Sequence, residues 1–421
     1  MSPKKPVDSL GCLCLEAVTQ ITLFSVKVAR IKEIKRYLSE APQKIREDIF
    51  AKVVTSSTTN SHDKWIMYEV FQYTFPWLDC RNVSKAYHQM FLERAKNLLH
   101  LNLKGSSINE RSLIDALKKL DHLKSLAIPS LASDQTLEEV SKLRHLVLLD
   151  ISGVNSFTSA GLRLLKITHL EILIIGLERC PNVTSSDDQD IMTEVVTNLP
   201  SLREVRTYSY MGDVVLKLQG PTNLEAISIQ ILDSNVAQSI ARKCPRLKKL
   251  SMLDPPSCQL QMLQNLKRLR SLRVENLELQ YARVNFDSSM RALETLKLAR
   301  VKGIEVADAA VSLPNLEVLE LIECDVPKDL VLSILKGCRR LRRVAMSNDV
   351  GLTDKDLLSI CKGDSLKNLE QLWLTRARHL SSDSVVLLMN HCDKLVLIGT
   401  LNGWNVEKVE TNYLSWKKSP Q

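Results

Sequence analysis

The sequence predicts an α/β solenoid, in which short parallel β-strands alternate with helices. The first observation is a motif, Leu-x-x-Leu-x-Leu with conservative replacements, that recurs thirteen times. The second is its spacing, since most copies follow one another after 22 to 28 residues, with one interval of 32 after Leu170. The third is helical periodicity between copies, as in residues 112–117 and 329–335. The copies begin at Leu98, Leu123, Leu146, Leu170, Leu202, Leu224, Leu247, Leu269, Leu293, Leu316, Leu341, Leu369 and Leu395.

Each copy of the motif has the alternation of a strand that is buried on one face. Because successive side chains of a strand point to opposite faces, the leucines point inward and the residues between them point to an open face, which we expect to be concave. A single repeat cannot bury its own apolar edge, whereas stacked repeats form a continuous core. A period of about 20 to 29 residues with this motif is typical of leucine-rich repeats. We therefore expect a leucine-rich-repeat solenoid with helices on the side opposite the sheet.

Three cysteines occupy one position of the repeat. Cys244, Cys338 and Cys392 each precede the first leucine of a motif by three residues. Equivalent positions lie on separate coils, so these thiols cannot share one metal ion, and we expect them to pack as small apolar side chains. These repeats resemble the cysteine-containing class of leucine-rich repeats, whose segment between strand and helix is matched by residues 351–357.

Composition and motifs argue against catalysis. Apolar residues make up 44% of the chain and charged residues 25%, as in an ordinary folded protein. The sequence lacks a glycine-rich nucleotide loop, a His-Glu-x-x-His zinc motif and a Gly-x-Ser-x-Gly elbow, and its eight histidines are scattered. We therefore expect no enzyme activity, no cofactor and no metal site.

The cysteines and the hydropathy pattern indicate the compartment. Ten cysteines without paired spacing predict reduced thiols, and hence a cytoplasmic or nuclear protein. The sequence has no stretch of about 18 uncharged apolar residues that would predict a membrane span. The net charge of +9 combines 57 basic with 48 acidic residues, which is typical of a mixed, solvated surface.

The first residues of the chain carry a short motif. Leu10, Cys14 and Val18 follow one another at intervals of four, which places them on one stripe of a helix that Asp8 or Ser9 can cap. Residues 9–18 resemble the elongin BC-box, read as Ser or Thr, Leu, three residues, Cys, three residues and an apolar residue. The resemblance implies that Leu10, Cys14 and Val18 bind elongin C.

A second motif follows in residues 41–50. Pro42 suits the first turn of a helix, on which Ile45 and Ile49 form another apolar stripe. This segment resembles the cullin-2 box, with Pro42, Ile45 and Ile49 as the cullin contacts, but it departs from that pattern at Ala41, where the family prefers a larger apolar residue.

The order of the motifs resembles that of the Zyg-type substrate receptors of cullin-2 ubiquitin ligases. That resemblance implies a non-catalytic substrate-recognition subunit whose partners are elongin C, elongin B, cullin-2 and an unidentified protein substrate. Armadillo repeats, which grip substrates in that family, are not found in these 421 residues, so the family's substrate rule does not carry over.

Two alternatives remain. Pro42, Ile45, Ile49 and Phe50 also resemble the opening of an F-box, and residues 81–85 resemble its later helix, which would imply binding to the Skp adaptor of a cullin-1 ligase. However, the stretch from Pro42 to Val83 is longer than an F-box, and an F-box would leave residues 9–18 unexplained. The second alternative is a non-degradative scaffold whose first 96 residues only cap the solenoid.

The motifs divide the chain into four parts. We expect a helical adaptor-binding module in residues 1–55 and a helical cap of the solenoid, rich in aromatic residues, in residues 56–96. The leucine-rich repeats follow in residues 97–402, and residues 403–421 form a tail.

The open face of the repeats is the predicted substrate site. Its positions lie two, four and six residues after each first leucine, and many of them are basic, although Glu204, Glu275 and Glu320 interrupt the series. This pattern predicts a groove for an acidic or phosphorylated peptide, with Trp373 as an apolar anchor. Nucleic acid is disfavoured, because few aromatic residues stand between the basic ones to stack bases. The candidate substrate-binding residues are Arg206, Tyr208, Lys249, Arg273, Lys297, Arg343 and Trp373.

Overall fold

The structure of the protein is a computed structural model. It describes residues 10–27, 31–42, 44–46, 48–49, 52, 76–82, 88–94, 98–176, 188–207, 211–258, 263, 265–283, 290–305, 313–347, 350–363, 365–399, 401 and 403–405.

The chain forms two compact units, and their boundary falls within the repeats. Unit 1 contains residues 1–202 and 206–208, and unit 2 contains residues 203–205 and 209–421. The boundary passes through strand β6 (Glu204–Thr207), shortly after the longest interval between copies of the motif.

Unit 1 begins with helices and continues into a parallel sheet. The helices are α1 (Leu10–Lys27), α2 (Ile31–Glu40), the 3-10 helix η1 (Cys80–Asn82), α5 (His88–Arg94), α6 (Glu110–Leu117), α7 (Asp134–Ser141), α8 (Ser159–Arg163) and α9 (Asp188–Asn198). The strands are β1 (Trp77–Asp79), β2 (His100–Asn102), β3 (Ser125–Ala127), β4 (Leu148–Ile151) and β5 (Ile172–Ile175), paired in this order.

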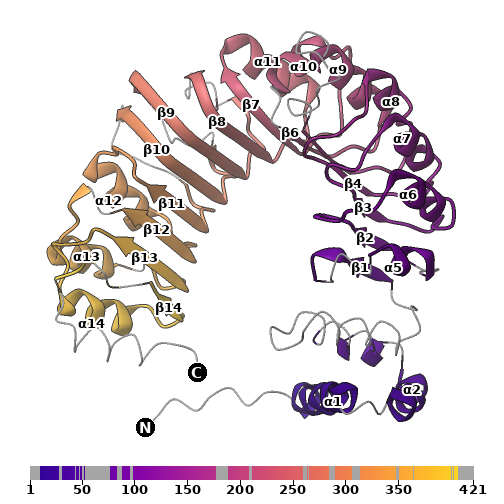
Figure 1. Ribbon diagram of the computed structural model, residues 1–421. Helices are drawn as coiled ribbons and strands as arrows, with labels where there is room; N and C mark the ends of the chain where they lie inside the picture. The colour runs from indigo at the N-terminus through magenta and orange to yellow at the C-terminus, as the bar shows by residue number, and fades with distance from the viewer. Residues whose placement is uncertain are drawn as a thin grey trace. The chain divides into compact units, whose positions relative to one another are not determined.

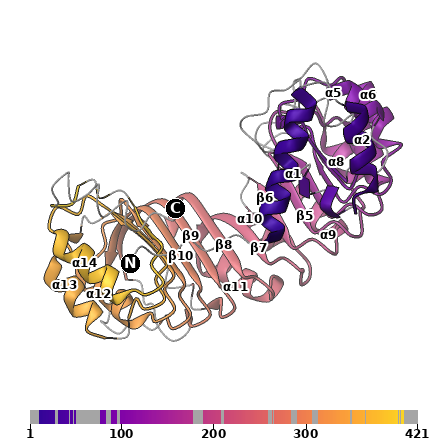
Figure 2. The same cartoon turned by 90° about the horizontal axis from the view of Figure 1, so that it is seen from below.

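Unit 2 is also built on a parallel sheet and has more coils (Figure 1). Its strands are β7 (Ala226–Leu232), β8 (Lys249–Cys258), β9 (Ser271–Arg283), β10 (Thr295–Glu305), β11 (Val318–Ile322), β12 (Arg343–Ser347), β13 (Gln371–Thr375) and β14 (Leu397–Ile398), again parallel and in sequence order. Its helices are α10 (Met211–Lys217), α11 (Ser234–Lys243), α12 (Lys328–Gly337), α13 (Asp354–Cys361) and α14 (Ser382–His391), of which α12 to α14 lie side by side along one face of the sheet (Figures 1 and 2).

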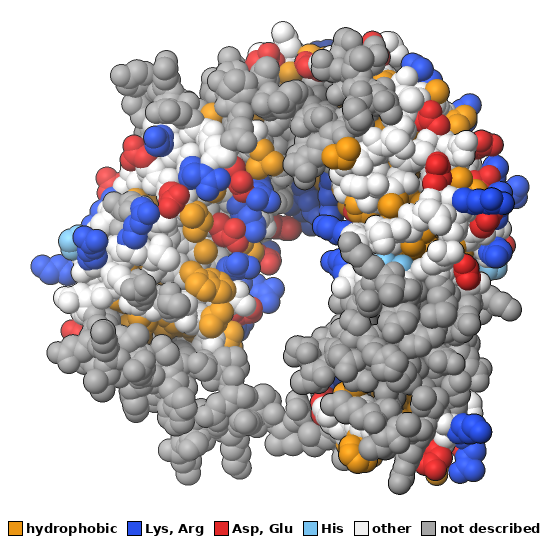
Figure 3. Space-filling view, viewed as in Figure 1, with side chains coloured by type: hydrophobic (Ala, Val, Ile, Leu, Met, Phe, Trp, Pro, Cys, Tyr) orange, Lys and Arg blue, Asp and Glu red, His pale blue; other side chains and the backbone are white. Residues whose placement is uncertain are grey.

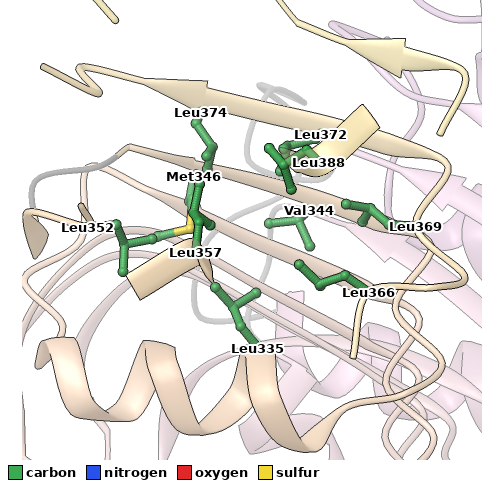
Figure 4. Close-up of a pocket in the computed structure, with 10 residues that line it drawn as sticks. All are labelled: Leu335, Val344, Met346, Leu352, Leu357, Leu366, Leu369, Leu372, Leu374 and Leu388. Atoms are coloured by element: carbon green, nitrogen blue, oxygen red, sulfur yellow. The ribbon is translucent and has the colours of Figure 1, made fainter. Parts of the chain in front are cut away.

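The register of the strands confirms the predicted leucine-rich-repeat fold. Equivalent motif positions pair across neighbouring coils, as Leu296 does with Leu272 on one side and Leu319 on the other. All three side chains are buried. Strand and helix side chains meet in the core of the last repeats, where leucines of α12, α13 and α14 point toward those of β13 (Figure 4). The pocket in this view is lined only by Leu, Val and Met, so it belongs to the repeat core.

Helix starts in adjacent repeats are joined by hydrogen bonds. The N-cap Thr158 of α8 donates its backbone N–H and its hydroxyl to Asp134, the first residue of α7, over 2.7 Å each. Likewise, Ser381, the N-cap of α14, donates both groups to Asp354, the first residue of α13, over 2.9 Å each. Each carboxylate therefore satisfies donors at the next helix terminus, which links the coils on the helix side.

The cap predicted in residues 56–96 is not entirely helical. Strand β1 lies within it and extends the sheet by pairing with β2, in register Leu78 with Leu101. Leu78 and Cys80 are buried, so this segment is a further copy of the motif, in which Cys80 replaces the last leucine. The first coil therefore has its open edge covered by a strand. A helix over the same edge would leave the N–H and C=O groups of β2 unpaired.

The helices expected opposite the sheet are not found among the described residues in the middle of unit 2. Among the described residues there, no helix follows β8, β9 or β10, and these strands run for 10, 13 and 11 residues. The chain continues in extended form past the turn, where Val301 pairs with Leu277 and both are buried. Two prolines, Pro255 and Pro256, favour extended backbone at the corresponding point of β8.

One position of the motif has a left-handed backbone conformation in seven of the coils. Seven described residues that stand seven positions after the first leucine of a motif have φ values between 52° and 86°. Glycine adopts such values without strain, whereas other L-residues favour them less. The seven residues are Gly105, Ser130, Gly153, Asn276, Arg300, Glu323 and Arg376.

The last coil is closed by Trp404. Its side chain is buried, and its indole N–H donates to the carbonyl of Leu374 over 2.9 Å. The predicted tail in residues 403–421 therefore begins with a residue that packs on the repeats, and residues 406–421 lie outside the described part of the chain.

Candidate partner-binding surfaces

Helix α1 exposes an apolar face. Cys14 is exposed, and Val18, Ile21 and Phe24 are 40%, 62% and 65% exposed. At 100° per residue these four positions fall within about 120° of the helix circumference. Leu10, the first helical residue, occupies the same face by its position four residues before Cys14. We call Leu10, Cys14, Val18, Ile21 and Phe24 the α1 outer face.

The opposite face of α1 is buried. It includes Leu23 and two threonines, Thr19 and Thr22. Their hydroxyls donate to the carbonyls of Leu15 and Val18 over 2.7 Å, four residues earlier in each case. Because these bonds satisfy the buried hydroxyls within the helix, the two threonines can pack against the apolar interior of the module.

The structure extends the predicted stripe. Sequence reasoning identified Leu10, Cys14 and Val18, which the structure brings onto one face, but it missed Ile21 and Phe24. The helical spacing of Cys14, Val18 and Ile21 was a usable signal, because positions i, i+4 and i+7 share a helix face. Asp8 and Ser9, predicted to cap this helix, lie outside the described residues.

The predicted cullin contacts do not share one environment. Pro42 is exposed and Ile45 is 46% exposed, whereas Ile49 is 1% exposed and packs inside the module. Lys52 ties this segment back to α1 through an ion pair with Glu16, with 2.8 Å between Nζ and Oε2. The structure therefore leaves only Pro42 and Ile45 of this group at the surface.

The F-box alternative falls only partly on described residues. Phe50 and residues 83–85 lie outside them, whereas Arg81 lies in the short 3-10 helix η1. The structure therefore leaves this alternative open.

The predicted substrate residues lie on the open strand face, meaning the strand positions that point away from the helices. Lys249 lies on β8, Arg273 on β9, Lys297 on β10, Arg343 on β12 and Trp373 on β13. Arg206 lies on β6 and is exposed, and Tyr208 falls outside the described residues. Over β9 to β13, the surface in Figure 3 carries basic, acidic and hydrophobic side chains close together.

Intramolecular ion pairs neutralise part of this basic face. The guanidinium of Arg273 pairs with Glu275, its neighbour two residues along the same strand. Lys297 pairs with Glu320 over 3.0 Å, and Arg343 approaches the same carboxylate oxygen over 3.5 Å. Two of the acidic residues that interrupt the basic series, Glu275 and Glu320, are therefore partners of the basic ones.

The cysteines at the shared repeat position are buried, as that position predicted. They are Cys244, Cys338 and Cys392. Burial raises the pKa of Cys338 to about 12, so its thiol stays protonated and unreactive near neutral pH. By contrast, Cys14 is exposed on α1.

The described residues contain no cluster of metal-ligating side chains and no helix suited to crossing a membrane. No group of three or more His, Cys, Asp or Glu side chains could hold a metal ion. None of the described helices combines the length and the hydropathy that crossing a bilayer requires.

Comparison with known proteins yields likenesses of fold at low identity. No family model matches the sequence, and no curated protein matches it. An internalin (inlF) from Listeria monocytogenes str. 4b F2365 is 16% identical, with a TM-score of 0.41 over 69% of this chain and 89% of that chain. The Rad7 and Elc1 complex in yeast gives 16% identity and a TM-score of 0.47 over 93% of this chain and 98% of that chain. An internalin C2 (inlC2) from the same Listeria strain is 18% identical, with a TM-score of 0.30 over 51% of this chain and 88% of that chain.

These TM-scores are below 0.5, so the likenesses support no inference about partners or activity. The leucine-rich-repeat fold is established by the strand order and register of this chain itself.

Proposed function

We propose that this chain is a non-catalytic receptor that connects an elongin C-type adaptor to a protein held by its leucine-rich repeats. The α1 outer face binds the adaptor, and the repeats bind the second protein. In such an assembly the receptor contributes proximity, and the transfer of ubiquitin belongs to other subunits.

The observation that carries the proposal is the exposed apolar face of α1. Val18, Ile21 and Phe24 are exposed, whereas the buried face of the same helix includes two polar residues, Thr19 and Thr22. The large apolar side chains are therefore on the side of the helix that faces solvent. An amphipathic helix with an apolar face at the surface is suited to a hydrophobic groove on a partner. The Leu-x-x-x-Cys-x-x-x-Val order on this face matches the pattern that elongin C recognises in the BC-box family, which selects elongin C among possible partners.

The cullin contact is the finer part of the proposal. Pro42 and Ile45 are the surface residues that would meet cullin-2, and Ile49 supports them from inside the module. We also place the protein in the cytoplasm or nucleus, where the free thiols of its described cysteines persist.

A pull-down with matched variants tests the proposal. The full chain is recovered from cells as wild type, as Val18→Asp and as Gln20→Asp. Both positions are exposed on α1, but they lie about 160° apart on the helix, so the same charge enters on and off the outer face. The expected result is recovery of elongins B and C by wild type and Gln20→Asp, and their loss with Val18→Asp.

Three other outcomes contradict the proposal. Recovery of the Skp adaptor in place of the elongins would establish the F-box alternative. Recovery of neither adaptor would leave a scaffold. Equal recovery of elongins by Val18→Asp and wild type would show that the outer face of α1 is not the adaptor site.

A further inference from the structure

A group of three charged side chains on β10, β11 and β12 carries an excess of positive charge. The carboxylate of Glu320 lies between Lys297 and Arg343, with its Oε1 atom 3.0 Å from Lys297 Nζ and 3.5 Å from Arg343 Nε. Two cations therefore share one anion, and the net charge of the group is +1. The nearby pair Arg273 and Glu275 is neutral, so the excess is local to this group.

The guanidinium of Arg343 also stacks on an aromatic ring. Its Cζ atom lies 4.9 Å from the centroid of the Trp373 indole on β13. Stacking fixes the plane of the guanidinium, which carries five N–H donors and uses Nε toward Glu320. About half of the Arg343 side chain, 46%, remains exposed. The arginine is therefore oriented and accessible to a second anion.

The indole of Trp373 can lie flat against the sheet because its neighbours on the adjacent strands are small. Ala345 stands opposite it on β12. On the other side, a Cβ atom built at Gly399 would lie 2.1 Å from Trp373 Cδ1, so the ring occupies the space that any side chain there would need. Glycine at position 399 lets the indole lie across the backbone of the last coil.

We propose that Lys297, Glu320, Arg343 and Trp373, here called the 373 patch, bind an extended segment of a protein partner that presents a carboxylate near an aromatic or aliphatic side chain. The carboxylate approaches Arg343 and Lys297, and the apolar side chain lies on the indole. Because the inference rests on the proposed function, it names the class of protein that the repeats hold.

The strand spacing sets the distance between the two recognised groups. Neighbouring strands lie about 4.8 Å apart, so the point midway between Lys297 on β10 and Arg343 on β12 lies about 10 Å across the sheet from Trp373 on β13. An extended chain advances about 3.3 Å per residue. The acidic and apolar side chains of the partner should therefore stand two or three residues apart.

A random twelve-residue peptide display library, selected against the full-length chain, tests the inference. The expected selection is of sequences with Asp or Glu two or three positions from an aromatic or aliphatic residue. Binding of the best synthetic peptide is then measured by fluorescence anisotropy. Trp373→Ala and Arg343→Gln should each weaken it at least tenfold.

Arg342→Gln is the matched control, because Arg342 adjoins Arg343 in sequence but pairs with Glu370 outside the 373 patch. It removes the same charge and should change the affinity less than twofold. Circular dichroism of each variant verifies that it is folded. Selected peptides without acidic residues, or equal effects of the substitutions at 342 and 343, would overturn the inference.

Two further measurements separate the inference from its alternatives. A peptide with phosphoserine in place of the acidic residue that binds more than tenfold tighter would overturn the carboxylate assignment in favour of a phosphorylated segment. Elongin recovery is measured on the same variants and should not change. Loss of peptide binding with elongins retained supports the 373 patch, whereas peptide binding without any elongin recovery contradicts only the proposed function.

Discussion

Asp354 should be a major stabilising residue of the last two repeats. Its carboxylate accepts hydrogen bonds from the backbone N–H of Ser381 and the hydroxyls of Ser381 and Ser384. Ser384 is 1% exposed, so without Asp354 its hydroxyl would be buried without a partner. At roughly 1 kcal/mol for each hydrogen bond, Asp354→Ala should lower the free energy of unfolding by about 3 kcal/mol.

The contribution of Asp354 should also depend on pH. Burial acts to raise the pKa of Asp354, but hydrogen bonds from Ser384 and Ser381 outweigh it and hold the pKa below its ordinary value of 3.8. A carboxylate with a depressed pKa in the folded state stabilises the protein above its unfolded-state pKa. The stabilisation is lost as the pH falls through the folded-state pKa, below 3.8.

Urea denaturation followed by circular dichroism measures this effect. Between pH 7 and pH 3, Asp354→Asn should lose less stability than wild type, because its side chain cannot be protonated. Asp383→Asn is the control, since Asp383 is exposed in the first turn of α14, and it should change stability by about 0.5 kcal/mol or less. If wild type and Asp354→Asn lost stability in parallel as the pH fell, the assignment of the hydrogen bonds to an ionised carboxylate would be refuted.

Three other substitutions test the repeat core and its ends, each by urea denaturation. Leu296→Asp places an unpaired charge at a fully buried position and should cost about 3 kcal/mol or more, and a smaller loss would contradict the register of β10. Gly161→Ala would bring a Cβ atom to 2.1 Å from Asp134 Oδ1, so we expect a loss of about 1–3 kcal/mol, and an unchanged midpoint would refute that close approach. Trp404→Phe removes the hydrogen bond to Leu374 and should lower the free energy of unfolding by about 1 kcal/mol. An unchanged free energy of unfolding would show that residue 404 does not pack on the last coil.

The sequence predicted the coils well because each must bury the same leucine positions. The thirteen copies of the motif coincide with strands β2 to β14, and their register follows from the pairing of positions such as Leu272 and Leu296. Strand β1 escaped prediction because Phe75 and Cys80 stand where the motif has leucines. A pattern defined by one residue type therefore fails at the end of the array, where the buried Cys80 stands at a leucine position.

The return segments could not be predicted from local periodicity alone. Within β9 and β10 the chain stays extended beyond the motif because Leu277 and Val301 pair across neighbouring coils and are both buried. That pairing depends on both coils being extended, which a single window of sequence does not reveal. Likewise, the left-handed turn residues Arg300 and Glu323 have no glycine to mark them.

The sequence predicted which residues belong to the candidate sites better than it predicted their burial and their charge partners. The stripe of Cys14 and Val18 follows from helical spacing, and the structure places both at the surface. Burial of Ile49 depends on tertiary packing that the spacing of Ile45 and Ile49 does not specify. The neutralising role of Glu320 is likewise visible only when β10, β11 and β12 are brought side by side.

The central claim, that the outer face of α1 binds an elongin C-type adaptor, is tested most directly by the reactivity of Cys14. The thiol is exposed in the isolated chain, so it should be alkylated readily by iodoacetamide. The purified full-length chain is labelled with and without a saturating amount of purified elongin B–C complex, and the modified residue is identified by fragment-resolved mass spectrometry. The proposal predicts that the complex slows alkylation of Cys14 at least tenfold and has no such effect with Val18→Asp. An unchanged rate at Cys14 in the presence of the complex would contradict the claim.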